Sequence, residues 1–413
     1  MKADYFKETV PKLFRNGTVR CVSPTETLNR VRPFFPIMGI TRVANVTGLD
    51  SIGIPVVMVS RPNSRALAVA QGKGLDIPCA KASGVMESIE QYHAEHIHLP
   101  LVSGTHDELC YTYNIVDVEG LPKIKGSLFH NSFRLLWLEG FDLVQSEEVW
   151  VPYEVVNADF TLPLPSGSGC FIPSSNGLAS GNKPIEAVIH GICELVERDA
   201  TSIWDLLSPD EQQKSRLDLE SVNDPACVGI LQAFERARIA VGVWVTTSDV
   251  GIPSFTCYIV DAIENPLRQL YATAGHGCDP SRGIALLRAL LEAAQSRLTL
   301  ISGSRDDTLR TTYELNRSRR VVNTLRSHIL SGSPQVQFSS VPTFDGQYFN
   351  DDLVWILERL ENIAIEQVVV VNLSKPEFEI PVVRVIIPGL EGSNHSPGYI
   401  PGERARKIIA RNA

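Results

Sequence analysis

The sequence has no long uninterrupted apolar run, and no stretch approaches the roughly 18 residues of a membrane-spanning helix. Residues 1–17, MKADYFKETVPKLFRNG, also lack the apolar centre of a secretory signal peptide. The 8 cysteines are scattered and none forms a CxxC pair, which argues against a zinc site. These absences predict a cytoplasmic protein with reduced thiols. One of these thiols, Cys170, lies in a loop without a visible histidine partner, and we interpret it as a packed side chain.

Basic residues are in the minority, and the formal net charge is −9. This charge argues against a general nucleic-acid binder, although a local basic pocket stays possible. Hydrophobic residues make up 44% and charged residues 21%, as in a globular protein. With 413 residues the chain can bury a large core and could hold two or three domains. We find no internal repeat, low-complexity segment or long linker.

The most informative stretch is 175–200, SNGLASGNKPIEAVIHGICELVERDA. A loop rich in glycine and asparagine precedes Pro184, which suits the first turn of a helix. At about 100° per residue, one helix face is apolar, and the opposite face carries Glu186, His190, Glu194, Glu197 and Arg198. Like charges this close are costly unless a cation joins them, and carboxylate oxygens suit Mg²⁺. The helix alone leaves open an alternative, a solvated acidic face with one Glu194–Arg198 pair.

A second helix is predicted over residues 79–97, with Ser83, Glu87 and Glu90 on a face away from its apolar stripe. Two such helices, each near a glycine-rich loop, predict that their acidic faces meet across a metal-bound ligand. The stretch 71–74 places Lys73 between glycines, where its ammonium and bare amides could reach a phosphate. The GxxxxGK[ST] spacing is missing, and the residues by themselves favour a simple turn.

The rest of the chain alternates predicted strands and helices. Strands are expected at 39–46 and 54–60 as a hairpin, at 135–138 and 148–151 around a turn at Glu139–Gly140, at 240–247 and 255–261 as a pair, and at 368–372 and 382–387. Helices are expected at 25–31, 228–238, 281–301 and 353–363. In the helix over 281–301, Arg288, Glu292, Gln295 and Ser296 share a polar side, and Arg297 stands apart from them.

Three motifs, in this order, resemble the YcaO family. They are GKG with ASGVMESIEQYHAE, then SNGLASG followed by EAVIHGICELVERDA, then RALLEAAQSRLTLISGSRDD. The resemblance spans roughly residues 40–390. It implies a mixed α/β fold whose helices pack on mixed sheets, with the ATP site between the motif helices and a sheet. It also implies a catalytic domain over 56–390, an N-terminal segment over 1–55 packed on it, and a tail over 391–413.

The resemblance also implies ATP and Mg²⁺ as cofactors, and it assigns residues to them. The matching positions are Glu87, Glu90, Glu186, Glu194, Glu197, Arg198, Gln295 and Arg297, with Lys73 and Ser83 as neighbours of the nucleotide. Among these, Glu87, Glu90, Glu194 and Glu197 are the expected metal ligands. Glu194, Glu197 and Arg198 are the expected catalytic residues. Gln91 departs from the family, which often has arginine there, so one phosphate or carboxylate partner is missing.

The activity that the resemblance implies is ATP-dependent activation of a peptide backbone amide. The N-terminal run from Thr18 to Ser64 is similar to members that accompany TfuA-like proteins, which favours thioamide formation in a ribosomally made peptide or protein. The chain also lacks the proline-rich end of azoline-forming members. Azoline formation on Cys, Ser or Thr is the alternative, and a non-catalytic ATP-binding partner is a second one. We expect a homodimer, a precursor peptide substrate and a TfuA-like partner, without nucleic acid or membrane.

Overall fold

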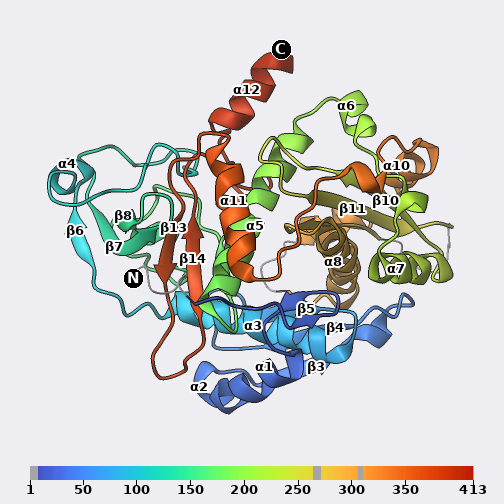
Figure 1. Ribbon diagram of the computed structural model, residues 1–413, viewed down its shortest axis with the longest axis horizontal. Helices are drawn as coiled ribbons and strands as arrows, with labels where there is room; N and C mark the ends of the chain where they lie inside the picture. Colours follow the sequence, from blue (N-terminus) through green and yellow to red (C-terminus); the bar gives the residue numbers. More distant parts are fainter. Residues whose placement is uncertain (1–7, 264–270, 306–309, 413) are drawn as a thin grey trace.

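The computed structural model describes residues 8–263, 271–305 and 310–412 as a mixed α/β protein (Figure 1). Its sheets are antiparallel, and helices pack against them. The predicted fold class is therefore confirmed. Within the described ranges, no helix is both long enough and apolar enough to cross a membrane.

The first part of the chain forms a small hairpin and a three-stranded sheet. Its elements are β1 (Phe14–Arg15), β2 (Val19–Arg20), α1 (Pro24–Val31), α2 (Phe35–Met38), β3 (Arg42–Asn45), β4 (Val56–Ser60), β5 (Val69–Lys73) and α3 (Ile77–Glu95). Strand β4 is central and pairs with both β3 and β5, which explains its nearly continuous apolar sequence. The predicted hairpin of 39–46 with 54–60 is confirmed by the β3–β4 pairing. The domain division at residue 55 stays a prediction and falls between these paired strands.

A six-stranded sheet lies beside this part and has the order β6-β7-β13-β14-β9, with β8 on β7. The elements on and around it are β6 (Val102–Gly104), α4 (His106–Leu109), β7 (Leu135–Asp142), β8 (Glu147–Pro152), β9 (Leu178–Ser180), β13 (Val369–Asn372) and β14 (Val382–Ile386). The predicted turn at Glu139–Gly140 is wrong, because both residues lie inside β7. A Cβ atom at Gly140 would lie 2.8 Å from Cγ1 of Val369, so the glycine serves the contact with β13.

The third sheet has the order β10-β11-β12 and carries α8 on one side. Its elements are α7 (Pro225–Arg236), β10 (Ile239–Val245), β11 (Ser254–Asp261), β12 (Ala272–Cys278) and α8 (Arg282–Ser302). The other helices are α5 (Pro184–Asp205), α6 (Pro209–Lys214), α9 (Arg310–Asn316), α10 (Arg319–Ser331), α11 (Phe349–Glu361) and α12 (Glu403–Asn412). Helix α5 packs against β14 and β9 and also contacts β12, so it joins the second and third sheets.

Glycines set the distance between the three long helices and their sheets. A Cβ atom at Gly72 in β5 would lie 2.0 Å from the carbonyl oxygen of Ala80 in α3. One at Gly275 in β12 would lie 2.1 Å from the amide nitrogen of Ala293 in α8. On α5, a Cβ atom at Gly191 would lie 2.6 Å from Cγ2 of the Val385 side chain in β14. Residues 71–73 are therefore a strand that needs glycine for helix contact, and the turn favoured by their sequence is wrong.

Candidate functional site

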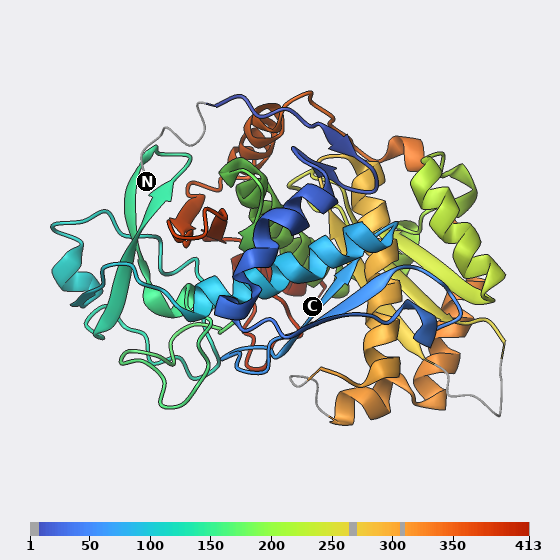
Figure 2. The same cartoon turned by 90° about the horizontal axis from the view of Figure 1, so that it is seen from below.

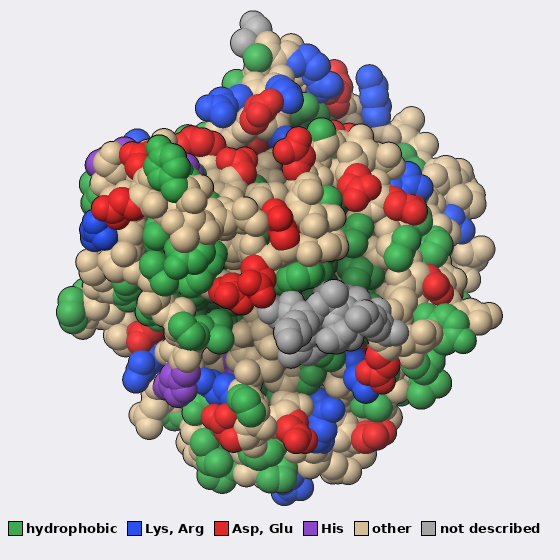
Figure 3. Space-filling view, turned by 60° about the vertical axis from the view of Figure 1, so that its left-hand side comes forward, with side chains coloured by type: hydrophobic (Ala, Val, Ile, Leu, Met, Phe, Trp, Pro, Cys, Tyr) green, Lys and Arg blue, Asp and Glu red, His purple; other side chains and the backbone are tan. Residues whose placement is uncertain are grey.

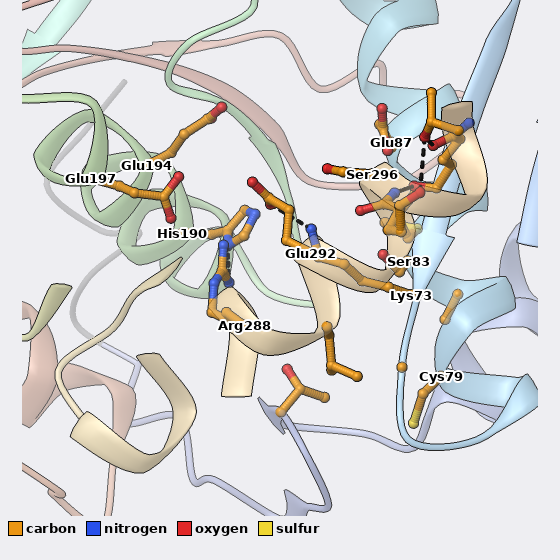
Figure 4. A pocket seen from close by; sticks show the side chains of 18 of the residues that line it. Lys73, Cys79, Ser83, Glu87, His190, Glu194, Glu197, Arg288, Glu292 and Ser296 are labelled. Carbon is orange, nitrogen blue, oxygen red and sulfur yellow. Dashed lines mark hydrogen bonds and ion pairs between the residues drawn. The ribbon is translucent and has the colours of Figure 1, made fainter. Parts of the chain in front are cut away.

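The helices α3, α5 and α8 surround a cavity of about 900 Å³, which β5, β12 and the β1–β2 hairpin also line. Figure 4 shows side chains from all three helices and from β5 pointing toward it. The acidic, basic and histidine side chains that line it are Arg20, Lys73, Glu87, Glu90, His190, Glu194, Glu197, Arg198, Arg288, Glu292 and Arg305. Five carboxylates and several cations thus line one cavity.

Helix α3 contributes three side chains that follow one another along a single face. The helix begins after Asp76, whose carboxylate accepts a hydrogen bond from the amide of Cys79 at 2.8 Å. Ser83, Glu87 and Glu90 then face the cavity at successive turns. Glu90 accepts hydrogen bonds from the amide and the hydroxyl of Ser180, at 2.8 and 2.7 Å. Glu90 is thus held against Ser180, and a backbone hydrogen bond at Gln71 holds Glu87.

Helix α5 places Glu194, Glu197 and Arg198 on the opposite wall. Arg198 Nη2 lies 3.7 Å from Glu194 and its Nη1 lies 3.4 Å from Glu197. Glu194 also accepts a hydrogen bond from the amide of Gly177 at 3.1 Å. The guanidinium thus lies at long ion-pair distances from two carboxylates and forms no tight bidentate pair with either. It can therefore turn toward an anionic ligand.

Helix α8 and β5 form the third wall. Lys73 Nζ lies 2.7 Å from Glu292, which also accepts a hydrogen bond from the amide of His276 at 3.2 Å. Gln295 donates to the carbonyl oxygen of Gln71 at 2.9 Å, so it connects α8 to the same strand. The GKG strand and the third motif helix therefore meet directly at the cavity.

Burial dominates the electrostatics of the acidic walls. It raises the pKa of Glu87 to about 7 and that of Glu90 to about 8, and the charge of Glu194 adds to both shifts. It also raises the pKa values of Glu194 and Glu197. Burial alone would raise the pKa of Glu292 too, but Lys73 and Arg198 lower it to about 2. A cation placed among the first four carboxylates would reverse their shifts.

The donor set fits Mg²⁺ held together with a polyphosphate. Across the described ranges, no three acidic, histidine or cysteine side chains converge closely enough to bind a metal by themselves. Mg²⁺ at nucleotide sites needs only one or two carboxylates, because waters and phosphate oxygens complete its octahedron. Glu87, Glu90, Glu194 and Glu197 supply such carboxylates from two sides of the cavity. Which of them bind the metal stays a prediction.

Two predicted ligand residues do not line the cavity, whereas Lys73, Ser83, Glu87, Glu90, Glu194, Glu197, Arg198 and Gln295 do. Glu186 is 2% exposed, and its carboxylate accepts hydrogen bonds from the amides of Cys21, Asn182 and Lys183. It stabilises the start of α5. Arg297 is 1% exposed and is bound by carboxylates of Asp50 and Asp261, each at 2.9 Å. Both side chains are saturated by the protein itself.

The sequence analysis did not assign several arginine, histidine and glutamate residues of the cavity. They are Arg20, His190, Arg288, Glu292 and Arg305. Glu292 had a usable signal, because it lies one helical turn before Gln295 on the same polar side. His190 contacts Arg288 at 3.1 Å, and burial lowers its pKa, so it is neutral there. Arg20 comes from the β1–β2 hairpin and has no such signal.

The raised pKa values give a prediction for stability without ligand. Glu87 and Glu90 titrate near 7 and 8 in the folded state, against an ordinary value of 4.5. At pH values between the ordinary pKa of 4.5 and these raised pKa values, the folded state binds more protons than the unfolded state. The free energy of unfolding therefore falls as pH rises. Thermal unfolding should therefore occur at lower temperature near about pH 8 than near about pH 6, and Mg²⁺ with a nucleotide analogue should reduce the difference.

The matched control is the double variant Glu87→Gln/Glu90→Gln, which has the same shape but no titrating carboxyl. Differential scanning fluorimetry should show a smaller fall in its melting temperature over that pH range. An unchanged pH dependence in the variant would contradict the assignment to these two glutamates.

Comparison with known proteins gives relatives over nearly the whole chain. Residues 71–391 match the family model described as YcaO cyclodehydratase, ATP- and Mg²⁺-binding. A protein of Rhizobium leguminosarum bv. trifolii, described as an uncharacterized protein in the tfuA 3′ region, is 36% identical over 379 residues, which are 90% of this chain and 88% of the relative. A protein of Methanothermobacter thermautotrophicus is 33% identical over 396 residues, which are 94% of this chain and 99% of the relative.

Solved structures share the fold. The YcaO protein of Methanopyrus kandleri, bound with AMPPCP and Mg²⁺, has a TM-score of 0.73 and 24% identity, over 96% of this chain and 99% of that one. A heterocyclase in complex with substrate and cofactor has a TM-score of 0.78 and 21% identity over 98% of this chain. Only 56% of the heterocyclase is covered, so this chain spans about half its length.

Proposed function

This chain belongs to the YcaO family of ATP- and Mg²⁺-binding peptide-modifying enzymes, and from that premise we propose that it forms thioamides in a ribosomally made peptide or protein together with a TfuA-like partner. The observation that carries the proposal is the cavity itself. Five glutamates and the cations Lys73, Arg198 and Arg288 face one space between three motif helices. Phosphoryl transfer needs that combination of metal-binding carboxylates and phosphate-binding cations.

The reaction activates an amide that is otherwise unreactive. Hydrosulfide adds to the amide carbon, the former carbonyl oxygen receives the γ-phosphoryl group of ATP, and phosphate leaves as the C=S bond forms. The thiol proton of the adduct leaves with the phosphate, so that amide, hydrosulfide and ATP give thioamide, ADP and phosphate. The protein need not supply a nucleophile. Its residues bind, orient and neutralise charge.

The residues have separate tasks in this proposal. Glu87 and Glu90 on one wall, with Glu194 and Glu197 on the other, would hold Mg²⁺. Lys73 and Arg198 would bind phosphate oxygens, and each now lies beside a carboxylate that it would exchange for the ligand. Gln295 and Ser83 would orient the nucleotide. Positioning by such fixed groups supplies most of the rate in phosphoryl transfer.

The choice of thioamide formation rests on similarity to TfuA-associated proteins. A relative at 36% identity is described by its position in the tfuA 3′ region. The run from Thr18 to Ser64 is also similar to members that accompany TfuA-like proteins. Helix α12 lies away from the cavity: Arg404 pairs with Asp199 and Asp249, and the helix projects from the body of the protein (Figure 1). The predicted homodimer, the cytoplasmic location and the need for the partner stay predictions.

The test is mass spectrometry of candidate peptides after incubation with the protein, Mg-ATP and sulfide, with and without a TfuA-like protein. The expected result is replacement of one oxygen by sulfur, with one ATP consumed per product. Loss of one water at Cys, Ser or Thr would instead establish azoline formation, the activity that the cyclodehydratase family model favours. Tight Mg-nucleotide binding without modification of any peptide would favour the non-catalytic partner.

A further inference from the structure

The segment over residues 310–331 is basic, although the chain as a whole is acidic. It contains five arginines and one glutamate, in a chain of formal net charge −9. The segment forms α9 and α10, which lie at the end of α8 (Figure 2). We call it the α9–α10 surface.

Two of its arginines are exposed at the start of α10. Arg319 and Arg320 have no acidic partner among the residues that the structure describes, whereas Arg310 pairs with Glu314 at 2.6 Å. The first turn of α10 contains no acidic residue, and cations there oppose the helix dipole. Helix stability therefore does not account for this pair of arginines.

The α9–α10 surface is continuous with the cavity. Asn316 of α9 and Val321 and Leu325 of α10 line the cavity, as does Arg305. Arg320 directly precedes Val321, so the exposed arginines lie within one helical turn of the cavity lining. An extended peptide advances about 3.3 Å per residue. A substrate whose amide lies in the cavity and whose chain leaves it beside Val321 therefore passes these arginines.

We propose that the α9–α10 surface binds an acidic segment of the peptide substrate, close in sequence to the amide that is modified. Arg319 and Arg320 pair with its carboxylates, because guanidinium groups bind carboxylates in a bidentate manner. Leu315 and Leu330, which are 59% and 64% exposed, offer apolar contacts on the same helices. The net negative charge of the rest of the chain disfavours other docking sites for such a segment. This inference rests on the proposed function.

The first experiment measures binding without any chemistry. The probe is a fluorescein-labelled peptide of alternating glutamate and glycine, titrated in the presence of saturating Mg-AMPPCP so that the phosphate-binding cations are occupied. Arg319→Glu/Arg320→Glu should weaken binding by about tenfold, and the wild-type affinity should fall with salt. The control is Arg406→Glu/Lys407→Glu on α12, where Lys and Arg side chains also gather (Figure 3). It changes the net charge equally and should alter the affinity less than about twofold.

Equal losses in the two double variants would overturn the proposal, because the probe would then sense only the net charge. Mg-AMPPCP affinity serves as the check of folding and should be the same in both. The second experiment compares kcat/KM for an acidic peptide that the enzyme modifies with kcat/KM for the analogue in which each Glu is replaced by Gln. Arg319→Glu/Arg320→Glu should lower kcat/KM only for the acidic peptide.

The outcomes separate this inference from the proposed function. If the probe binds through the two arginines but the wild type modifies no peptide, the result would support the α9–α10 surface and contradict thioamide formation. If both double variants modify peptides with the same kcat/KM, the result would support thioamide formation and contradict the α9–α10 surface. An effect that is seen only with a TfuA-like protein present would assign the arginines to that partner and would also overturn the proposal.

Discussion

Arg198→Met is expected to lower peptide-dependent ATP turnover by about 10³-fold, because an arginine on the transferring phosphoryl group is typically worth that much or more. Arg198 lines the cavity between Glu194 and Glu197, at 3.7 and 3.4 Å. Burial would lower its pKa, but these two carboxylates raise it, so its charge is assured. Methionine keeps the volume and removes only the cation. The measurement is steady-state phosphate release with a peptide that passes the mass-spectrometric assay.

Two further variants interpret the result. Arg198→Lys keeps the charge without the planar fork, and it should recover part of the lost turnover. Arg236→Met removes an exposed arginine on α7, outside the cavity lining, and should leave turnover unchanged. Turnover of Arg198→Met within about threefold of wild type would contradict a role on the phosphoryl group.

Arg297→Met is expected to lower the free energy of unfolding by about 3–5 kcal/mol, since it leaves buried carboxylates without their cation. Arg297 Nη1 and Nη2 donate to Asp261 at 2.9 and 3.1 Å, and Nε donates to Asp50 at 2.9 Å. The side chain joins α8 to β11 and to the segment before β4. The measurement is the urea or thermal unfolding transition of the variant beside that of wild type.

The control for Arg297 is its neighbour on the same helix. Gln295→Ala removes a residue that lines the cavity, so it should weaken Mg-AMPPCP binding with little change in unfolding. Below its unfolding temperature, Arg297→Met should bind the analogue as wild type does. The reverse result, normal stability with lost nucleotide affinity, would restore the nucleotide role that the family resemblance assigned to Arg297.

The cavity walls were predictable because the periodicity of a helix is local. Glu87, Glu90, Glu194 and Glu197 fall on one side of two amphipathic patterns, and the structure brings both patterns to one cavity. Glu186 lies outside the cavity lining, and its nucleotide role stays a prediction, although the signal for its local contacts was also present in the sequence. It is the third helical residue after Lys183, the position from which a glutamate caps the start of its own helix.

Other assignments depended on residues far away in the sequence. The partners of Arg297 are Asp50 and Asp261. Both lie outside the third motif, so no pattern within that motif predicts the contacts. The sequence predicts turns at Gly72 and Gly140, because a single sequence does not distinguish a turn glycine from one that makes room for a neighbouring element. What decides is the neighbour, Ala80 for the first and Val369 for the second.

The glycine contacts under α3 and α8 also have a mechanical consequence. A helix that rests on a strand through side chains can slide as rotamers change, but one in backbone contact has no deformable layer beneath it. Gly72 and Gly275 therefore make the walls formed by α3 and α8 stiff. The β1–β2 hairpin and α9–α10 also line the cavity, outside these two backbone contacts. On the proposed function, we expect the groups on α3 and α8 to keep a constant spacing while the hairpin and α9–α10 adapt to the bound peptide.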